Sequence, residues 1–400
     1  MIFNGRGFFF FTLPLSQDSN APSSPSGSSD IYLKKKIALS ITSFALTLVY
    51  LGLLAFTGLK APFIRLSFIS HNIYLSFLIF VFAVEIVLSI IKFPVDYCSD
   101  FVMEHTFSLS NQPFLKWVLR KMKIDVVGGI VGLVVLIIFY ALLVNFQRSW
   151  WILFAVFFFL FQILVAQLFP TLILPLFYRL KPLDKEELKS RLQTLVEKFG
   201  YRMNGVFSFD LSRETKKANA AMTGLGKTRK IIISDTLLDS FSAGEIEVVM
   251  AHELGHLVKH HMMKGIALSA AVSVIGFFVV AQAYSAYAEV IHAPVYALNT
   301  LPFLAVLMSI LGVISVPVGN YYSRRIEHEA DLFALDTTGM NAEFVETMRK
   351  LGKLNLSPEN PPAWIEKIFF SHPSIGARIK SALDSEEGRS NRPSLLENTK

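Results

Sequence analysis

The stretch VVMAHELGHLVKHH, residues 248–261, places four histidines and one glutamate within fourteen residues. Upstream of it, Ser242 and Glu245 have the spacing of a capping box, in which the side chain of each residue accepts a hydrogen bond from the backbone N–H of the other. The capping box precedes a periodic apolar run. The sequence therefore predicts a helix that begins near Ala243 and runs through the stretch.

On that helix His252 and His256 lie one turn apart on the same face, where two imidazoles can bind one zinc ion. Glu253 is rotated about a quarter turn away, so it can reach a water on the metal rather than the metal itself. This is the H-E-x-x-H arrangement of zinc peptidases. Because the pattern is short, an ordinary helix rich in histidine remains an alternative until a third ligand is found.

The third ligand is not expected within the stretch. His260 lies about 12 Å along the helix axis from His252, too far to share its ion, and His261 is expected to point elsewhere. An H-x-x-G-x-x-H extension is absent, since Lys259 and Met262 occupy the positions that require glycine and histidine. The ligand must come from a distant segment.

The segment SRRIEHEADLFA, residues 323–334, could supply it. Glu327 and Asp331 share one face of a predicted helix, so Glu327 could complete a His₂Glu set and Asp331 could accept the free N–H of a ligating histidine. Glu329 is a rival ligand. A solvated, charged helix without a metal is the alternative for the whole segment.

Taken together, HELGH at 252–256 and S-R-x-x-E-x-x-A-D at 323–331 resemble the CAAX prenyl endopeptidase family of integral-membrane zinc proteases. Four further segments carry the resemblance: FVMEHTFSLSNQ (101–112), PTLILPLFYRLKPLDKEEL (170–188), ANAAMTGLGKTRKIIISDTLL (218–238) and FSHPSIGARI (370–379). The resemblance extends over about residues 90–385. It implies a mainly α-helical polytopic membrane protein with a cytoplasmic α+β gluzincin-type zinc peptidase domain.

The resemblance also implies roles for individual residues. It gives one zinc ion per chain three ligands, His252, His256 and Glu327. It gives Glu253 the role of catalytic base and Asp331 a supporting role beside the ligands.

Four more residues are candidates for contact with substrate. The resemblance places Asn219 and Ala220 on an edge strand, where the substrate backbone would pair through main-chain hydrogen bonds. His372 and Arg378 are candidates to bind the oxyanion or a substrate carboxylate. The alternative for both is a structural role in a helix–turn–helix.

The composition independently indicates a membrane protein. Hydrophobic residues make up 52% of the 400-residue chain, and there are 36 phenylalanines. Six segments have about the length and apolarity of a membrane span: 37–57, 73–91, 126–145, 150–177, 265–288 and 301–322. The fourth contains Pro170 and Pro175 and is expected to kink or end early. Eukaryotic members of the family are expected to have seven spans.

Lys and Arg gather in the loops on one side of these spans, which predicts that both termini and the zinc helix face the cytoplasm. We expect the inner membrane of a bacterium, or the endoplasmic reticulum membrane if the host is eukaryotic. The net charge of +7 is explained by basic residues that flank the spans and contact anionic lipid. No nucleic-acid partner is expected. The single cysteine, Cys98, excludes an internal disulfide.

The expected organisation has six parts. They are a disordered N-terminal segment (1–33), a membrane domain with spans one to four (34–180), the first part of the zinc peptidase domain with HELGH (181–263), spans five and six (264–322), the second part of the peptidase domain with the third ligand (323–383), and a disordered tail (384–400).

Three functions remain to be compared. The first is an endopeptidase that cuts near the C-terminus of CAAX proteins, with a peptide or protein substrate whose prenylation the resemblance implies. The second is a quality-control metalloprotease of the HtpX-like branch, with non-prenylated membrane proteins as substrates. The third is a transporter or scaffold in which HELGH is a coincidence.

Overall fold

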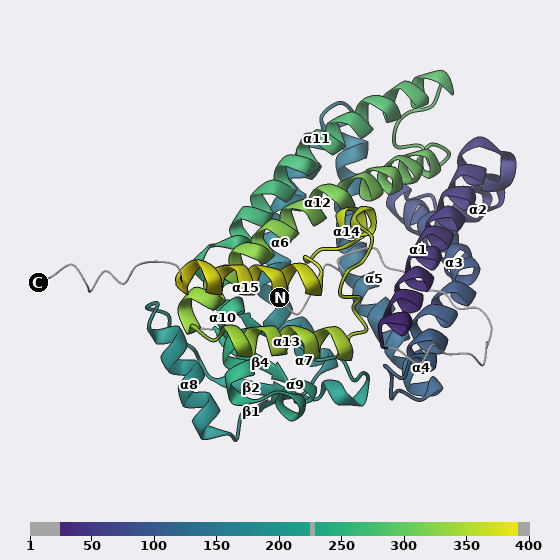
Figure 1. Ribbon diagram of the computed structural model, residues 1–400. Coiled ribbons are helices and arrows are strands. Elements are labelled where there is room, and N and C mark those ends of the chain that lie inside the picture. The colour runs from purple at the N-terminus through teal and green to yellow at the C-terminus, as the bar shows by residue number, and fades with distance from the viewer. Residues whose placement is uncertain (1–24, 225–228, 391–400) are drawn as a thin grey trace, which may run out of the picture.

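The computed structural model describes residues 25–224 and 229–390. Six of its helices are long and apolar enough to cross a membrane, which confirms the predicted number. They are α1 (Pro25–Phe56), α3 (Ile73–Tyr97), α5 (Phe114–Asn145), α6 (Trp150–Leu168), α11 (His261–Val290) and α12 (Leu301–Thr338). Figure 1 shows these long helices above and beside a smaller group of strands and helices at the bottom of the view.

The short elements of the membrane part connect these helices. The chain passes from α1 through a 3₁₀ turn (Gly58–Lys60) into α2 (Ala61–Ser67), and from α3 through a π turn (Cys98–Val102) into α4 (Met103–Thr106). The predicted interruption of the fourth span is confirmed. Helix α6 ends at Leu168, and a π turn (Phe169–Ile173) leads into α7 (Leu174–Phe177).

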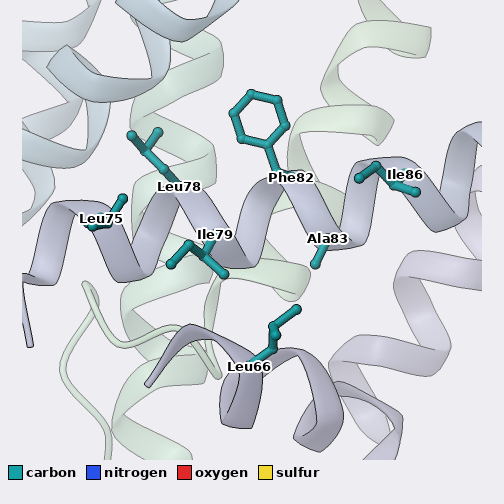
Figure 2. A pocket seen from close by; sticks show the side chains of 7 residues that line it. All are labelled: Leu66, Leu75, Leu78, Ile79, Phe82, Ala83 and Ile86. Carbon is teal, nitrogen blue, oxygen red and sulfur yellow. The ribbon is translucent and has the colours of Figure 1, made fainter. Parts of the chain in front are cut away.

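A pocket lies between α2 and α3 (Figure 2). Its lining consists of seven aliphatic or aromatic side chains: Leu66, Leu75, Leu78, Ile79, Phe82, Ala83 and Ile86. None of these side chains carries a polar atom, so the pocket offers no group for acid–base chemistry or metal binding.

The small sheet has four strands in the order β1-β2-β4-β3. They are β1 (Leu180–Pro182), β2 (Val206–Phe209), β3 (Ala220–Thr223) and β4 (Lys230–Ser234). Strand β4 is parallel to β2 and antiparallel to β3, and β1 is antiparallel to β2. Strand β3 therefore forms an edge of the sheet, as expected for the segment that begins at Ala220.

Both faces of the sheet are covered. Successive side chains of a strand point to opposite faces, and the isoleucines of β4 follow this rule. Ile231 and Ile233 pack into a core with α8 (Glu186–Glu197) and α10 (Ala243–Val258), whereas Ile232 packs with Leu174 on the other face. All three isoleucines are fully buried, so the sheet gives α10 a rigid base.

The remaining helices lie before α10 or after α12 in the chain. Helix α9 (Asp235–Ser240) precedes α10, and α13 (Asn341–Leu354), α14 (Ala363–Phe369) and α15 (Ile375–Ser390) follow α12. Ala334 of α12 belongs to the same buried cluster as Met250 and Leu254 of α10. The segments before and after the last two spans thus contribute to one core.

Four boundaries differ from the sequence predictions. Helix α1 begins at Pro25, so residues 25–33 are helical, and α15 continues to Ser390, beyond the expected start of the tail at 384; the rest of both segments lies outside the described residues. The predicted span 301–322 and the helix 323–334 form one continuous helix of 38 residues, about 57 Å long at 1.5 Å per residue. Helix α10 ends at Val258 rather than running to residue 261.

Candidate active site

Helix α10 carries the H-E-x-x-H motif. The predicted capping box is present at its start: the Ser242 hydroxyl accepts from the Glu245 N–H (3.3 Å), and the Glu245 carboxylate accepts from the Ser242 N–H (2.7 Å). The helix places the Nε2 atoms of His252 and His256 3.1 Å apart. Glu253, between them in the chain, is half-buried.

Gly255 allows α12 to approach this helix closely. A Cβ atom at Gly255 would lie 3.0 Å from Cδ1 of Phe333 and 3.2 Å from Cα of Ala330. Because the second contact is with backbone, a larger residue would push the two helices apart. The glycine therefore brings the part of α12 beyond the predicted membrane span, with Glu327, against the two histidines.

Glu327 completes the cluster that the sequence predicted. Its side chain is 7% exposed, with Oε2 3.1 Å from His252 Nε2 and Oε1 3.5 Å from His256 Nε2. One ligand atom of each of the three residues lies within 4.8 Å of the others. Burial alone would raise the pKa of Glu327, but neighbouring histidines, His372 first among them, hold it well below its usual range.

Asp331, one turn further along α12, fixes the orientation of His252. Its Oδ1 lies 2.8 Å from His252 Nδ1, and Arg378 of α15 donates to both carboxylate oxygens from Nε (2.8 Å) and Nη2 (2.5 Å). Burial would raise the pKa of Asp331, but the guanidinium of Arg378 outweighs it and the pKa falls to about 2. An ionised Asp331 can only accept, so His252 Nδ1 donates and its Nε2 faces Glu327.

The chemistry of this set fits a metal ion. Glu327 Oε2 is buried and, among the described residues, makes no hydrogen bond of acceptable geometry. Burial would lower the pKa of His252, yet Asp331 and Glu327 raise it to about 9, so the site attracts positive charge. Two imidazole nitrogens and a carboxylate that converge in this way are a donor set for a divalent metal ion.

His372 lies beside the cluster on the loop between α14 and α15. Its Nε2 is 3.3 Å from Glu327 Oε1, and its Nδ1 is 2.9 Å from the Ser371 hydroxyl. The side chain is 34% exposed, so it can be reached from solvent. The pKa of His372 lies below its usual value, and burial is the largest cause.

Arg324 anchors the loop that carries His372. Its Nη1 donates to the backbone carbonyls of Glu366 (3.0 Å) and Phe370 (2.6 Å) at the end of α14. The Glu366 carboxylate in turn accepts from the Ser374 N–H at 3.1 Å. The arginine of the S-R-x-x-E pattern thus ties the loop to α12 one turn before Glu327, a role that the sequence did not suggest.

Glu329, the rival ligand, contacts His261 instead of the proposed metal site. Its carboxylate lies 3.3 Å from Nε2 of His261, whose Nδ1 is 3.0 Å from Nδ1 of His256. His261 lies outside the group formed by His252, His256 and Glu327, as expected, but it contacts the Nδ1 side of His256 because α10 ends before it. His260 adopts a left-handed conformation (φ 54°), and the chain turns His261 back toward His256.

Asn219 and Ala220 lie at the start of the edge strand β3. The backbone N–H and C=O of Asn219 point toward β4, and those of Ala220 point away from it. Asn219 is engaged with β4: its C=O accepts from the Ser234 N–H, and its N–H donates to the Ser234 hydroxyl, both at 2.9 Å. Because ladder bonds alternate along an antiparallel strand, the backbone groups of Ala220 and Met222 face away from β4. Among the described residues no other strand pairs with that side of β3.

The arrangement combines three features that peptide hydrolysis requires: a donor set for a metal ion, a carboxylate on the same helix, and a free strand edge. Together with six membrane-crossing helices, these features define a membrane-embedded metallopeptidase.

Comparison with known proteins supports this class. The model of peptidase family M48 matches residues 182–386, and the model described as CAAX prenyl protease N-terminal, five membrane helices, matches residues 27–179. The crystal structure of S. mikatae Ste24p is similar to this chain with a TM-score of 0.80 and 22% sequence identity, and the similarity covers 93% of this chain and 92% of that one.

Two relatives are similar in sequence over most of their length. The uncharacterized metalloprotease YhfN of Bacillus subtilis is 28% identical over 315 residues, which cover 77% of this chain and 73% of YhfN. CAAX prenyl protease 1 of Saccharomyces cerevisiae is 27% identical over 317 residues, covering 74% and 69%. The chain belongs to peptidase family M48 and is a multi-pass membrane metalloendopeptidase of the CAAX prenyl protease type.

Proposed function

We propose that this protein is a zinc-dependent endopeptidase with one zinc ion per chain, held by His252, His256 and Glu327. The observation that carries the proposal is the convergence of two imidazoles and one carboxylate, each of which offers a ligand atom within 4.8 Å of the others. Zinc is the metal that two imidazoles and a carboxylate most often hold in peptidases.

The chain supplies the proton transfers. When bound, a zinc ion would polarise the scissile carbonyl and lower the pKa of a water molecule near it. Glu253 would accept the proton of the attacking water and return it to the departing amine. Its place next to His252 on α10 supports this role, because the helix fixes its distance from the ligands.

His372 would stabilise the negative charge that develops on the carbonyl oxygen. A neutral imidazole can donate one N–H to an oxyanion, and the partial exposure of His372 beside Glu327 supports such a contact.

The sequence suggested that Arg378 contacts the substrate, but its contacts with Asp331 favour a positioning role. The Nε and Nη2 groups of Arg378 both donate to Asp331, so its effect reaches the site through Asp331 and His252. We assign Arg378 to positioning.

The substrate would bind as an additional strand on β3. The outward backbone groups of Ala220 and Met222 provide hydrogen bonds that are largely independent of substrate side chains. Asn219, whose backbone is already bonded to Ser234, would contribute through its side chain.

We infer that the peptidase site faces the cytoplasm. Lys and Arg are concentrated in the loops on the side of the membrane that holds the peptidase part, and there they would also contact anionic lipid. The six spans and the similarity to a bacterial metalloprotease favour the bacterial inner membrane over the endoplasmic reticulum.

For the substrate we infer a protein with a prenylated C-terminus, and the support is that the yeast relative is named a CAAX prenyl protease. The alternative is HtpX-like quality control with non-prenylated substrates. It stays open because the name of the bacterial relative specifies no substrate. A transporter or scaffold is not supported, since the chain belongs to a peptidase family.

A pair of peptides separates the two substrate classes. The purified protein is incubated with a farnesylated CAAX peptide and with the same peptide unmodified, each with and without a chelator, and Glu253→Gln serves as the inactive control. We expect cleavage of the farnesylated peptide that the chelator abolishes. Equal cleavage of both peptides would support the alternative, and chelator-resistant cleavage would contradict a metal-dependent mechanism.

A further inference from the structure

A histidine outside the proposed ligand set is buried against it. His261 is the first residue of α11 and is 2% exposed. Helix α10 ends at Val258, and the left-handed backbone at His260 (φ 54°) reverses the chain. His261 therefore lies under His256 instead of continuing along α10.

The ring of His261 connects His256 to a carboxylate on α12. The Nδ1 atoms of His261 and His256 are 3.0 Å apart, and Nε2 of His261 lies 3.3 Å from Oε2 of Glu329. The two imidazole rings are nearly perpendicular, at 74°, with their centroids 5.1 Å apart. Each ring thus presents an edge nitrogen to the other.

The hydrogen atoms in this chain of contacts can be assigned by starting at the carboxylate of Glu329. An ionised Glu329 only accepts, so Nε2 of His261 donates to it. A neutral His261 then has a lone pair on Nδ1, which accepts the N–H of His256 Nδ1. As a result, His256 presents its Nε2 lone pair toward His252 and Glu327, which is the tautomer that a metal ligand needs.

We propose that His261 and Glu329 are positioning residues that fix the tautomer and ring orientation of His256, and so strengthen metal binding at His252, His256 and Glu327. Asp331 orients His252 by direct contact. Glu329 would orient His256 indirectly, because it contacts His261, which in turn contacts His256. The segment 327–331 of α12 would then supply one ligand, Glu327, and orient the other two. This inference rests on the proposed metal site.

The expected strength follows from the exposure of the two residues. His261 is buried and in direct contact with a ligand, and loss of such a partner commonly weakens metal affinity by about 10–100-fold. The Glu329 side chain is 37% exposed and also lies 3.6 Å from Arg325. Water can replace part of its contribution, so its removal should weaken binding less, by about 3–10-fold.

Zinc affinity of the purified full-length protein, measured by competition with a chromophoric chelator, tests the proposal. We expect His261→Phe, which keeps ring volume but has no acceptor, to bind zinc about 10–100-fold more weakly. His261→Gln retains an acceptor and a donor and should stay within about 3-fold of the wild type. Cobalt substitution adds a second readout, because the visible spectrum of bound cobalt reports its ligand geometry.

Two comparisons separate positioning from a general effect on folding. His260→Asn, at the exposed neighbour, keeps a residue that tolerates the left-handed backbone and should bind zinc like the wild type. Glu329→Ala should have no further effect when His261→Phe is already present, because the two act through one chain of contacts. If His261→Phe fails to fold, Glu329→Ala and His261→Gln still give the measurement.

The outcomes are distinct from those of the proposed function. Unchanged zinc affinity and cobalt spectrum in both His261→Phe and Glu329→Ala would overturn the inference. If His252→Ala still loses zinc in the same assay, the metal site stands without it. If His252→Ala binds zinc normally, the proposed site itself is wrong.

Discussion

Glu253 follows His252 on α10, and we assign it to proton transfer. Glu253→Gln keeps the size of the side chain but removes its ability to accept a proton. We expect turnover of a cleavable peptide to fall by about 10²–10⁴-fold while bound zinc stays stoichiometric by metal analysis. A zinc-loaded variant with wild-type turnover would exclude Glu253 from the mechanism.

Glu327 should decide whether the metal binds at all. Its carboxylate is buried between two histidines, and alanine leaves only two of the three proposed ligands. We expect Glu327→Ala to be purified without zinc and to be inactive. The matched control is His328→Ala, an exposed neighbour on the same helix, which should retain both zinc and activity.

The sequence predicted those site residues that are related to one another by a spacing of about one helical turn. His252, Glu253 and His256 follow from a single motif, and Glu327 with Asp331 from a spacing of four. The contact between His261 and His256 could not be predicted in this way, because it depends on a left-handed residue at His260, a conformation that residues other than glycine adopt only occasionally. The bidentate contact of Arg378 with Asp331 joins two helices that are distant in sequence.

The proposed ligands lie on two helices, α10 and α12, so the geometry of the site depends on how closely these helices pack. Gly255→Ala would add a Cβ atom 3.2 Å from the backbone of Ala330, so the helices must separate or tilt. We expect this substitution to lower the free energy of unfolding by about 1–3 kcal/mol and to weaken zinc binding, because Glu327 moves with α12.

A second glycine of α10 provides the control for this prediction. At Gly244 a Cβ atom would meet only Cγ of Glu343, at 3.5 Å, which is an ordinary contact. Gly244→Ala should leave zinc binding unchanged and raise stability slightly, by up to about 1 kcal/mol, because alanine is the better helix former. Thermal unfolding in detergent and zinc affinity, measured on both variants, give the comparison. If the two variants have equal stability and equal zinc affinity, the close approach of α12 at Gly255 does not affect either property.

Element boundaries were predictable where the chain carries a stop signal. Ser242 starts α10, and the proline-containing stretch after Leu168 ends α6. The sequence predicted that the membrane span ends at residue 322, where apolar residues give way to charged ones, but the helix does not end there. Such a change marks the end of the apolar region, but with no glycine or proline between 320 and 338 the helix itself continues to Gly339.

At the scale of the whole molecule, the helix ends fall into two groups. At one end Tyr287 of α11 donates to the Ala55 carbonyl of α1 (3.1 Å) and stacks on Phe303 of α12. At the other end the Glu104 carboxylate after α3 binds Lys36 of α1 and Lys217 of the peptidase part. The peptidase part therefore lies at the end opposite to the turn between α11 and α12.

This arrangement fixes which positions share a side of the membrane, and the Lys and Arg distribution predicts which side is cytoplasmic. In a Cys98→Ser background, we expect His71→Cys, between α2 and α3, to react with an impermeant maleimide on intact cells. Glu187→Cys, on α8, should react only after permeabilisation. Both positions are exposed, so a difference in labelling reflects the membrane rather than burial. The reverse pattern would place the peptidase part outside the cytoplasm and exclude cytoplasmic proteins as substrates, whereas labelling of both on intact cells would contradict the arrangement of the spans.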